Sequence, residues 1–212
     1  MQFPGETRIH DPILDLRYEI VIGAKPEEIW PWIVQLGYHR GGWYIDTWWD
    51  RAVQEHFWPR VVPKAARGSF KPPASMILPE YQSLSVGDIV PNGPPGSAFY
   101  EVIDLQTDHI LLLYSTSHFK YAVPQFVHKT RYAPRGGFCW AFILEDLLDG
   151  RSKLISWWQA EIRPKNFLFI VKPFFKFVDG VHQSEILKGI KRRVEHKISQ
   201  RLAGADGYGI DR

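Results

Sequence analysis

The chain of 212 residues is long enough for one large domain or two small ones, and 45% of its residues are hydrophobic. Its formal net charge of +3 is too weak to indicate a nucleic-acid partner. The single cysteine, Cys139, excludes an internal disulfide and favours a reducing compartment, so we expect a cytoplasmic protein. The sequence shows neither a signal peptide nor the roughly eighteen consecutive apolar residues that a spanning helix needs.

The first part of the chain carries one strand signal and one helix signal. Residues 1–15 contain two prolines and a glycine and are predicted to form a loose N-terminal arm. Residues 16–23 alternate and are rich in β-branched side chains, which predicts the first strand. At residues 24–28 a proline and two glutamates suit the first turn of a helix, which we expect to reach Leu36.

Residues 38–96 are dominated by aromatic residues, glycines and prolines. A second helix is predicted from about Asp46 to Phe57. Residues 58–80 contain five prolines and are predicted as a loop, which at this length is often a lid or partly disordered. Residues 84–90 indicate a strand, and the sequence NGPPG at residues 92–96 is typical of a turn.

Strand-like runs with short connections occupy the next part of the chain. The four clearest runs cover residues 99–105, 109–115, 138–145 and 153–162. Their spacing predicts an antiparallel meander. Another short strand is predicted near residues 121–127, where Pro124 interrupts the pattern.

The last long stretch, residues 179–202, is predicted to be the helix around which the domain is organised. Its apolar residues recur at steps of three and four, at Leu187, Ile190, Val194 and Ile198. Such a helix needs an apolar partner, because tertiary packing supplies most of its stability. The apolar run before it, residues 166–178, is either a kinked segment buried beside a cavity, which we favour, or an edge that dips into a membrane interface. Residues 203–212 are predicted to be a frayed, flexible tail.

Together these elements predict an α+β protein with a single domain over residues 16–202. In this arrangement a curved antiparallel β-sheet wraps around the long C-terminal α-helix, with short helices after the first strand. Aromatic residues make up 15% of the chain, including nine tryptophans. They indicate either a roomy pocket between sheet and helix or an aromatic core, and the composition leaves both open.

Two stretches of the sequence resemble a known superfamily. One is PEEIWPWIVQLG at residues 26–37, continued by RGGWY at residues 40–44; the other is PEYQSL at residues 79–84, continued by VGDIVP at residues 86–91. With the order of elements, they resemble the helix-grip fold of the START and polyketide-cyclase superfamily (SRPBCC), and within it an uncharacterised bacterial branch. The resemblance implies a cavity between sheet and C-terminal helix for apolar or amphipathic molecules. It implies no single activity, because the superfamily includes lipid carriers, hormone receptors and cyclases.

The glycine-rich stretch of residues 40–46 is the leading candidate for holding the polar end of a ligand. Arg40, Tyr44 and Asp46 offer a cation, a phenol and a carboxylate there, and Trp43 lies among them. The alternative is that Arg40 and Asp46 pair locally and fix the loop. Further ligand-binding candidates come from the strands: Tyr114, Trp140 and Trp157. Alternation separates the two faces of each strand, but both faces carry large apolar groups, so the inner face stays unassigned.

An enzyme is the second hypothesis, because a buried acid or base could catalyse a cyclisation or dehydration without a cofactor. The candidate catalytic residues are Tyr44, Asp46, Glu101 and His118. The alternative is that these are surface groups or satisfied core residues. The sequence lacks metal-ligand spacings and phosphate-binding loops, so we expect neither a metal nor a cofactor.

The third hypothesis is a peripheral membrane protein. Basic residues gather on the last helix, at Lys188, Lys191, Arg192, Arg193, Lys197 and Arg201, beside the apolar run of residues 166–178. They could make weak contact with anionic lipid headgroups, or they could form an ordinary solvated face. The first hypothesis, binding of an apolar or amphipathic small molecule such as a lipid or polyketide, is the one we favour. Ligand identity and oligomeric state are not encoded in any recognisable signal.

Overall fold

The computed structural model describes residues 2–5, 8–45, 71–93, 95–118, 130, 135–163 and 167–206, with backbone alone for residues 167–179, 202 and 204–206. A six-stranded antiparallel sheet has the strand order β1-β6-β5-β4-β3-β2. The elements are β1 (Leu14–Ile22), α1 (Pro26–Val34), a 3₁₀ helix (Pro79–Tyr81), β2 (Ile89–Pro91), β3 (Phe99–Gln106), β4 (Ile110–Ser115), β5 (Arg135–Asp146), β6 (Ser152–Arg163) and α5 (Phe167–Asp206).

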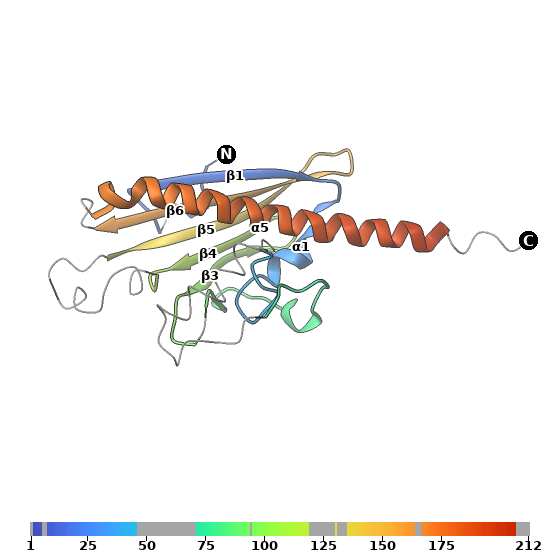
Figure 1. Cartoon of the computed structure of the whole chain (residues 1–212), viewed down its shortest axis with the longest axis horizontal. Coiled ribbons are helices and arrows are strands. Elements are labelled where there is room, and N and C mark those ends of the chain that lie inside the picture. Colours follow the sequence, from blue (N-terminus) through green and yellow to red (C-terminus); the bar gives the residue numbers. More distant parts are fainter. Residues whose placement is uncertain are drawn as a thin grey trace, which may run out of the picture.

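Helix α5 lies lengthwise along one face of the sheet, over β1 and β6, and its last turns extend beyond the sheet (Figure 1). Helix α1 packs against α5 near the end of β1. The predicted α+β helix-grip fold is therefore confirmed. The meander is also confirmed, because β3, β4, β5 and β6 pair in sequence order.

The start of the long helix was predicted wrongly. Helix α5 begins at Phe167 and continues through residues 166–178, which were expected to form a separate kinked segment, and it ends at Asp206 rather than Leu202. The apolar run has few polar residues, so the alternation of apolar and polar sides that marks an amphipathic helix cannot be recognised in its sequence. Within the described residues, no helix is both long and apolar enough to cross a membrane.

Alternation along the strands divides the core into two layers. On the face toward α5, the central strands contribute Leu113, Phe142, Leu154 and Trp158 to a core that includes Ile186 and Ile190 of α5. On the opposite face, Cys139, Ile143 and Ile155 form a second, smaller cluster. The N-terminal arm covers this second cluster, because Phe3 and Ile9 are buried against it. The expectation of a loose arm is thus corrected: two apolar side chains hold it to the sheet.

One further strand differs from its prediction, and two other predicted elements lie outside the described residues. Of the strand predicted at residues 84–90, only Ile89 and Val90 belong to β2, and the preceding residues form a turn closed by Asp88, whose Oδ2 accepts from the Ser85 amide at 2.8 Å. The helix predicted at residues 46–57 and the short strand predicted at residues 121–127 lie outside the described residues.

Candidate functional site

The loop that follows α1 is held by a buried glutamine. Gln35 is completely buried, and its amide nitrogen donates to Tyr44 Oη at 2.8 Å and to the Met76 carbonyl at 3.1 Å. Its amide oxygen accepts from the Leu78 backbone N–H at 2.8 Å. Tyr44 Oη in turn donates to the Trp32 carbonyl at 2.9 Å. Burial raises the pKa of Tyr44 above its ordinary range, so the phenol stays protonated.

Two glycines allow this loop to turn back on itself. Gly37 and Gly42 form an isolated antiparallel bridge, both with positive φ (124° and 79°). Non-glycine residues rarely adopt such angles, yet Tyr44 also does so, with φ of 57°. Its buried hydrogen bonds hold Tyr44 in that conformation.

Arg40 caps the C-terminal end of α1 rather than facing a ligand space. Its Nη2 donates to the Val34 carbonyl at 2.8 Å and its Nε donates to the Leu36 carbonyl at 3.0 Å. The guanidinium also lies 4.8 Å from the ring centroid of Tyr81. A cation is favourable at this end of a helix because it meets unpaired carbonyls and the negative end of the dipole. Arg40 is therefore used within the fold.

Helix α5 fixes the other side of the loop by close backbone contact. A Cβ added to Gly189 would lie 2.0 Å from the Tyr44 carbonyl oxygen, so no side chain fits there. Arg193, one turn later, lies with its guanidinium 4.7 Å from the Tyr44 ring centroid and donates to the Ala74 carbonyl at 2.7 Å. The loop is thereby placed between α1 and α5, with Trp43 beside the sheet.

Trp43 joins a continuous group of rings on the face of the sheet that α5 covers. We call this group the aromatic wall; its seven members are Trp43, Tyr100, His118, Phe138, Trp140, Phe142 and Trp158. Trp43 stacks on Trp140 with 5.1 Å between ring centroids and an interplanar angle of 18°. Two predicted ligand-binding residues, Trp43 and Trp140, and one predicted catalytic residue, His118, belong to the wall.

His118 is the titratable member of the wall. Its ring lies 4.6 Å from that of Tyr100 and 5.5 Å from that of Phe138. Both ring nitrogens have partners: Nδ1 lies 2.6 Å from Ser115 Oγ and Nε2 lies 3.0 Å from Asn92 Nδ2. Because the Asn92 amide nitrogen donates to Nε2, the imidazole proton is on Nδ1 and is donated to Ser115.

The serine beside His118 is not arranged as a nucleophile. Ser115 is buried, and its Oγ accepts from both His118 Nδ1 and the Ser117 backbone N–H at 3.1 Å. Its own proton is directed to Ser117 Oγ at 3.0 Å, and Ser117 Oγ donates to the Phe99 carbonyl at 3.0 Å. A nucleophilic serine needs its partner histidine as an acceptor and needs access to substrate. Both conditions fail here.

His118 gives a testable pH dependence. Burial lowers the pKa of His118 to about 4. Because the unfolded state would bind a proton first, below the ordinary pKa of about 6.5, we expect stability to fall as pH decreases from there towards 4, by up to about 3 kcal/mol from this group. Titrating the imidazole by NMR and comparing the pH dependence of unfolding with that of His118→Gln checks this; an NMR midpoint at the ordinary value would contradict it.

A buried polar chain links the aromatic wall to α5. Trp140 Nε1 donates to Ser156 Oγ at 2.8 Å, and Ser156 Oγ donates to Gln183 Oε1 at 2.6 Å. Both Ser156 and Gln183 are buried. Buried polar groups must be paired, so this chain fixes the position of the helix relative to the wall.

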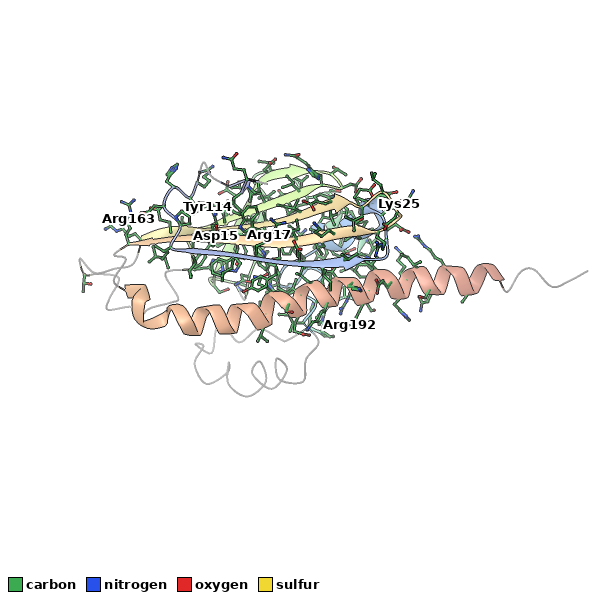
Figure 2. The ribbon with its side chains drawn as sticks, turned by 90° about the horizontal axis from the view of Figure 1, so that it is seen from above. Asp15, Arg17, Lys25, Tyr114, Arg163 and Arg192 are labelled. Carbon is green, nitrogen blue, oxygen red and sulfur yellow. The ribbon has the colours of Figure 1, made fainter. Side chains whose placement is uncertain are left out.

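Two predicted ligand-binding residues lie on the wrong face. Tyr114 and Trp157 belong to the second cluster, on the side of the sheet turned away from α5. Figure 2 shows Tyr114 on that side. Trp157 contacts Phe3 and donates to Asp15 Oδ1 at 2.6 Å, and Tyr114 lies under the Arg8 guanidinium. The correction follows from strand register, because residues on alternate positions point to opposite faces.

The predicted catalytic residues do not come together. Glu101 is exposed and pairs in register with Tyr114, which places it on the face away from α5. Tyr44 is enclosed in the hydrogen bonds of the loop, and Asp46 lies outside the described residues. In the part of the chain that the structure describes, no hydrogen bond joins any two of these candidates.

Sequence reasoning missed most of the aromatic wall. It named Trp43, Trp140 and His118 but not Tyr100, Phe138, Phe142 and Trp158, nor the polar pair Ser156 and Gln183. Alternation did place Phe142 with Trp140 and Ser156 with Trp158 on common faces. Knowing which face of the sheet is turned to α5 would have identified the residues of the wall that lie on strands.

The basic residues of α5 are largely engaged within the protein. Lys188 pairs with Glu185 at 2.9 Å, Lys191 donates to the Val21 carbonyl at 2.9 Å, and Arg201 contacts Glu28 at 3.4 Å. Membrane contact through this face stays a prediction. Among the described residues, no group of three or more His, Cys, Asp and Glu side chains could hold a metal ion.

Comparison with known proteins finds similarity in structure only. No protein-family model and no curated protein matches the sequence. The di-domain aromatase/cyclase StfQ of the steffimycin pathway has a TM-score of 0.47 at 11% identity over 89% of this chain, and norcoclaurine synthase from Thalictrum flavum has 0.44 at 14% over 85%. DynU16, a protein from the dynemicin biosynthetic locus, has 0.41 at 11% over 85%.

Coverage of these proteins differs. The chain spans 92% of the norcoclaurine synthase but only 52% of StfQ and 47% of DynU16, about half the length of each. Similarity of this degree concerns the arrangement of elements and says nothing about ligand or reaction.

Proposed function

We propose that the protein binds an apolar or amphipathic small molecule between the aromatic wall and α5. The observation that carries this proposal is the wall itself, in which seven rings from three strands, the loop of Trp43 and the turn of His118 adjoin one another. Aromatic rings offer large, rigid contact surfaces, and ligand sites in proteins are lined mainly by such groups with a few polar ones.

Apolar surface on β1 borders the same side of the sheet. On β1 the two ends of the face toward α5, Leu14 and Ile22, are buried, but Leu16, Tyr18 and Ile20 between them are only half-buried. Because β1 is an edge strand in contact with α5, these three side chains lie at the border between helix and sheet. They add apolar surface beside α5 that a ligand can contact.

His182 of α5 lies near the loop that carries Trp43. Its side chain is exposed to water. Residues seven apart share one side of a helix, so His182 lies on the side of Gly189, which faces the loop carrying Trp43.

Polar groups at this space favour a ligand with at least one oxygen. The Trp43 indole N–H is buried and finds no acceptor among the described residues. An unmet buried donor costs about 1–3 kcal/mol, so a ligand acceptor that reached it would remove this cost. Binding without chemistry is the simplest function for a wall whose histidine already has both nitrogens paired.

A probe-binding experiment with matched variants tests the proposal. Phe138 and Tyr114 are both half-buried aromatic residues of the central strands, but Phe138 faces α5 and Tyr114 faces away. We expect Phe138→Ala to weaken binding of the fluorescent probe anilinonaphthalene sulfonate about tenfold, since loss of a ring contact and its burial exceeds about 1.4 kcal/mol. Tyr114→Ala should leave the affinity unchanged.

Native mass spectrometry of the protein purified from bacteria adds an independent readout. We expect a co-purifying small molecule with the native chain and less of it with Phe138→Ala. Equal loss of probe affinity in both variants, with both folded by circular dichroism, would show that the probe does not bind at the wall. A native chain that binds neither probe nor any co-purifying molecule would contradict the proposal.

A further inference from the structure

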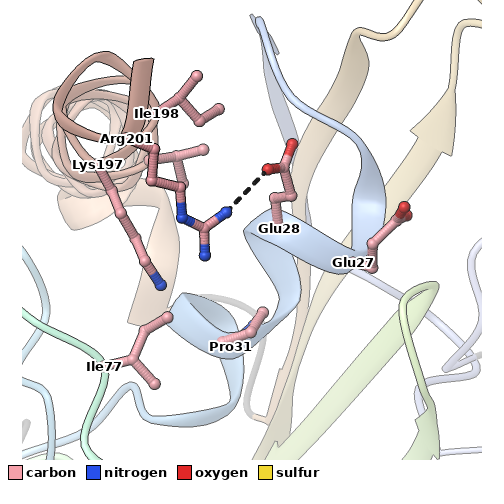
Figure 3. Close-up of a pocket in the computed structure, with 8 residues that line it drawn as sticks. Glu27, Glu28, Pro31, Ile77, Lys197, Ile198 and Arg201 are labelled. Carbon is pink, nitrogen blue, oxygen red and sulfur yellow. Dashed lines mark hydrogen bonds and ion pairs between the residues drawn. The ribbon is translucent and has the colours of Figure 1, made fainter. Parts of the chain in front are cut away.

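A separate cleft lies between α1 and the C-terminal half of α5, away from the aromatic wall. Its volume is about 130 Å³. Its walls are partly apolar, formed by Pro31 of α1, by Ile77 and by Ile198 of α5 (Figure 3). Two cations of α5, Lys197 and Arg201, also line it. Neither the sheet nor the loop of residues 37–45 contributes to its lining.

Lys197 is the unusual residue of this cleft. Its side chain runs past Arg201 towards Ile77, with the ammonium group on the side away from Glu28 (Figure 3). Within the described residues, no carboxylate or carbonyl makes a hydrogen bond or ion pair with it. Burial and then the charge of Arg201 lower the pKa of Lys197, whereas Glu28 opposes this change. The Lys197 side chain is half-buried and its ammonium lies near a second cation, so an anion at the cleft would stabilise both.

The carboxylates at the cleft do not supply that partner. Glu28 contacts Arg201 at 3.4 Å, and its other oxygen accepts from the Lys25 backbone N–H at 3.4 Å at the start of α1. The carboxylate of Glu27 points away from the cleft (Figure 3). Arg201 has five N–H donors, of which this contact uses one, so donors remain for a further anion.

We propose that this cleft binds a small carboxylic acid through Lys197 and Arg201, with its apolar body against Ile77, Pro31 and Ile198. The size fits, because a cavity of about 150 Å³ accommodates a molecule as large as benzene. The carboxylate accepts hydrogen bonds from both cations, and the apolar walls distinguish such an acid from a bare inorganic anion. This site is independent of the ligand proposed for the aromatic wall.

NMR titration of the full chain, with labelled isoleucine methyl groups, tests the site. We expect butyrate to shift the methyl signals of Ile77 and Ile198 saturably, with a dissociation constant in the millimolar range. Lys197→Gln should weaken this binding about tenfold or more, as expected for loss of a charge-assisted hydrogen bond. Arg201→Gln should weaken it similarly.

Lys188→Gln is the matched control, because Lys188 lies on the same helix but pairs with Glu185 outside the cleft. It should bind butyrate like the native chain. Equal weakening in Lys188→Gln, or no saturable shift with butyrate, would overturn the proposal. Equally strong binding of neutral butyramide would show that charge is irrelevant, and tighter binding of inorganic phosphate would show that the apolar walls contribute nothing; either result contradicts the site as proposed.

Discussion

Replacing Gly189 by alanine is expected to lower the free energy of unfolding by about 3 kcal/mol, the cost of overpacking a close contact. In an exposed helix interior the same change normally stabilises by about 1 kcal/mol, because alanine is the better helix former. Here the added Cβ would lie 2.0 Å from the Tyr44 carbonyl oxygen and 2.7 Å from the Tyr44 Cβ. Helix and loop would have to separate, so the sign of the effect is reversed.

Gly180→Ala is the control for this prediction. Gly180 is also in α5, but the nearest atom to its added Cβ is Tyr18 Oη at 3.3 Å, at the end of a side chain that can adjust. We expect Gly180→Ala to be neutral or slightly stabilising. Urea unfolding followed by circular dichroism measures both variants. If Gly189→Ala were as stable as the native chain, the close contact between α5 and the loop would be absent.

Replacing Gln35 by methionine, a side chain of similar length and shape, is expected to cost about 3 kcal/mol. The Leu78 N–H and the Met76 carbonyl lose the partner that Gln35 provides, and Tyr44 Oη loses one donor while it keeps its bond to the Trp32 carbonyl. Each buried group left unpaired costs about 1–3 kcal/mol, and the methionine offsets part of the total by its own burial. Because Tyr44 adjoins Trp43, we also expect weaker binding of the fluorescent probe at the aromatic wall.

Gln82→Met provides the comparison for Gln35→Met. Gln82 is half-buried, and its hydrogen bonds to Pro31, Leu78 and Gln35 are longer, from 3.2 to 3.3 Å. Water can replace some of them, so the loss should stay below about 1 kcal/mol. Chemical denaturation of the two variants under identical conditions gives the difference. Equal destabilisation would mean that burial of Gln35 does not determine the energy of the loop.

The RGGWY stretch carries a sequence signal that two different roles can explain. Its glycines and polar groups marked an unusual backbone, and the structure shows one. The sequence alone permitted either a ligand anchor or a loop fixed by local bonds. Arg40 and Tyr44 make the second kind of contact, because a buried polar atom left without a partner costs free energy. Trp43 is the member of this stretch that the loop presents to the aromatic wall.

The sequence by itself determined the order and type of the elements over residues 14–34, 99–115 and 135–163, because periods of 2.0 and 3.6 residues are local properties of the chain. It also identified Trp43, Trp140 and His118 as residues of interest. Only the tertiary structure decided which face of each strand meets α5, and it removed Tyr114, Trp157 and Glu101 from that face. The reason is physical: both faces bury apolar side chains, one under α5 and the other under the N-terminal arm, so alternation separates the faces without saying which is which.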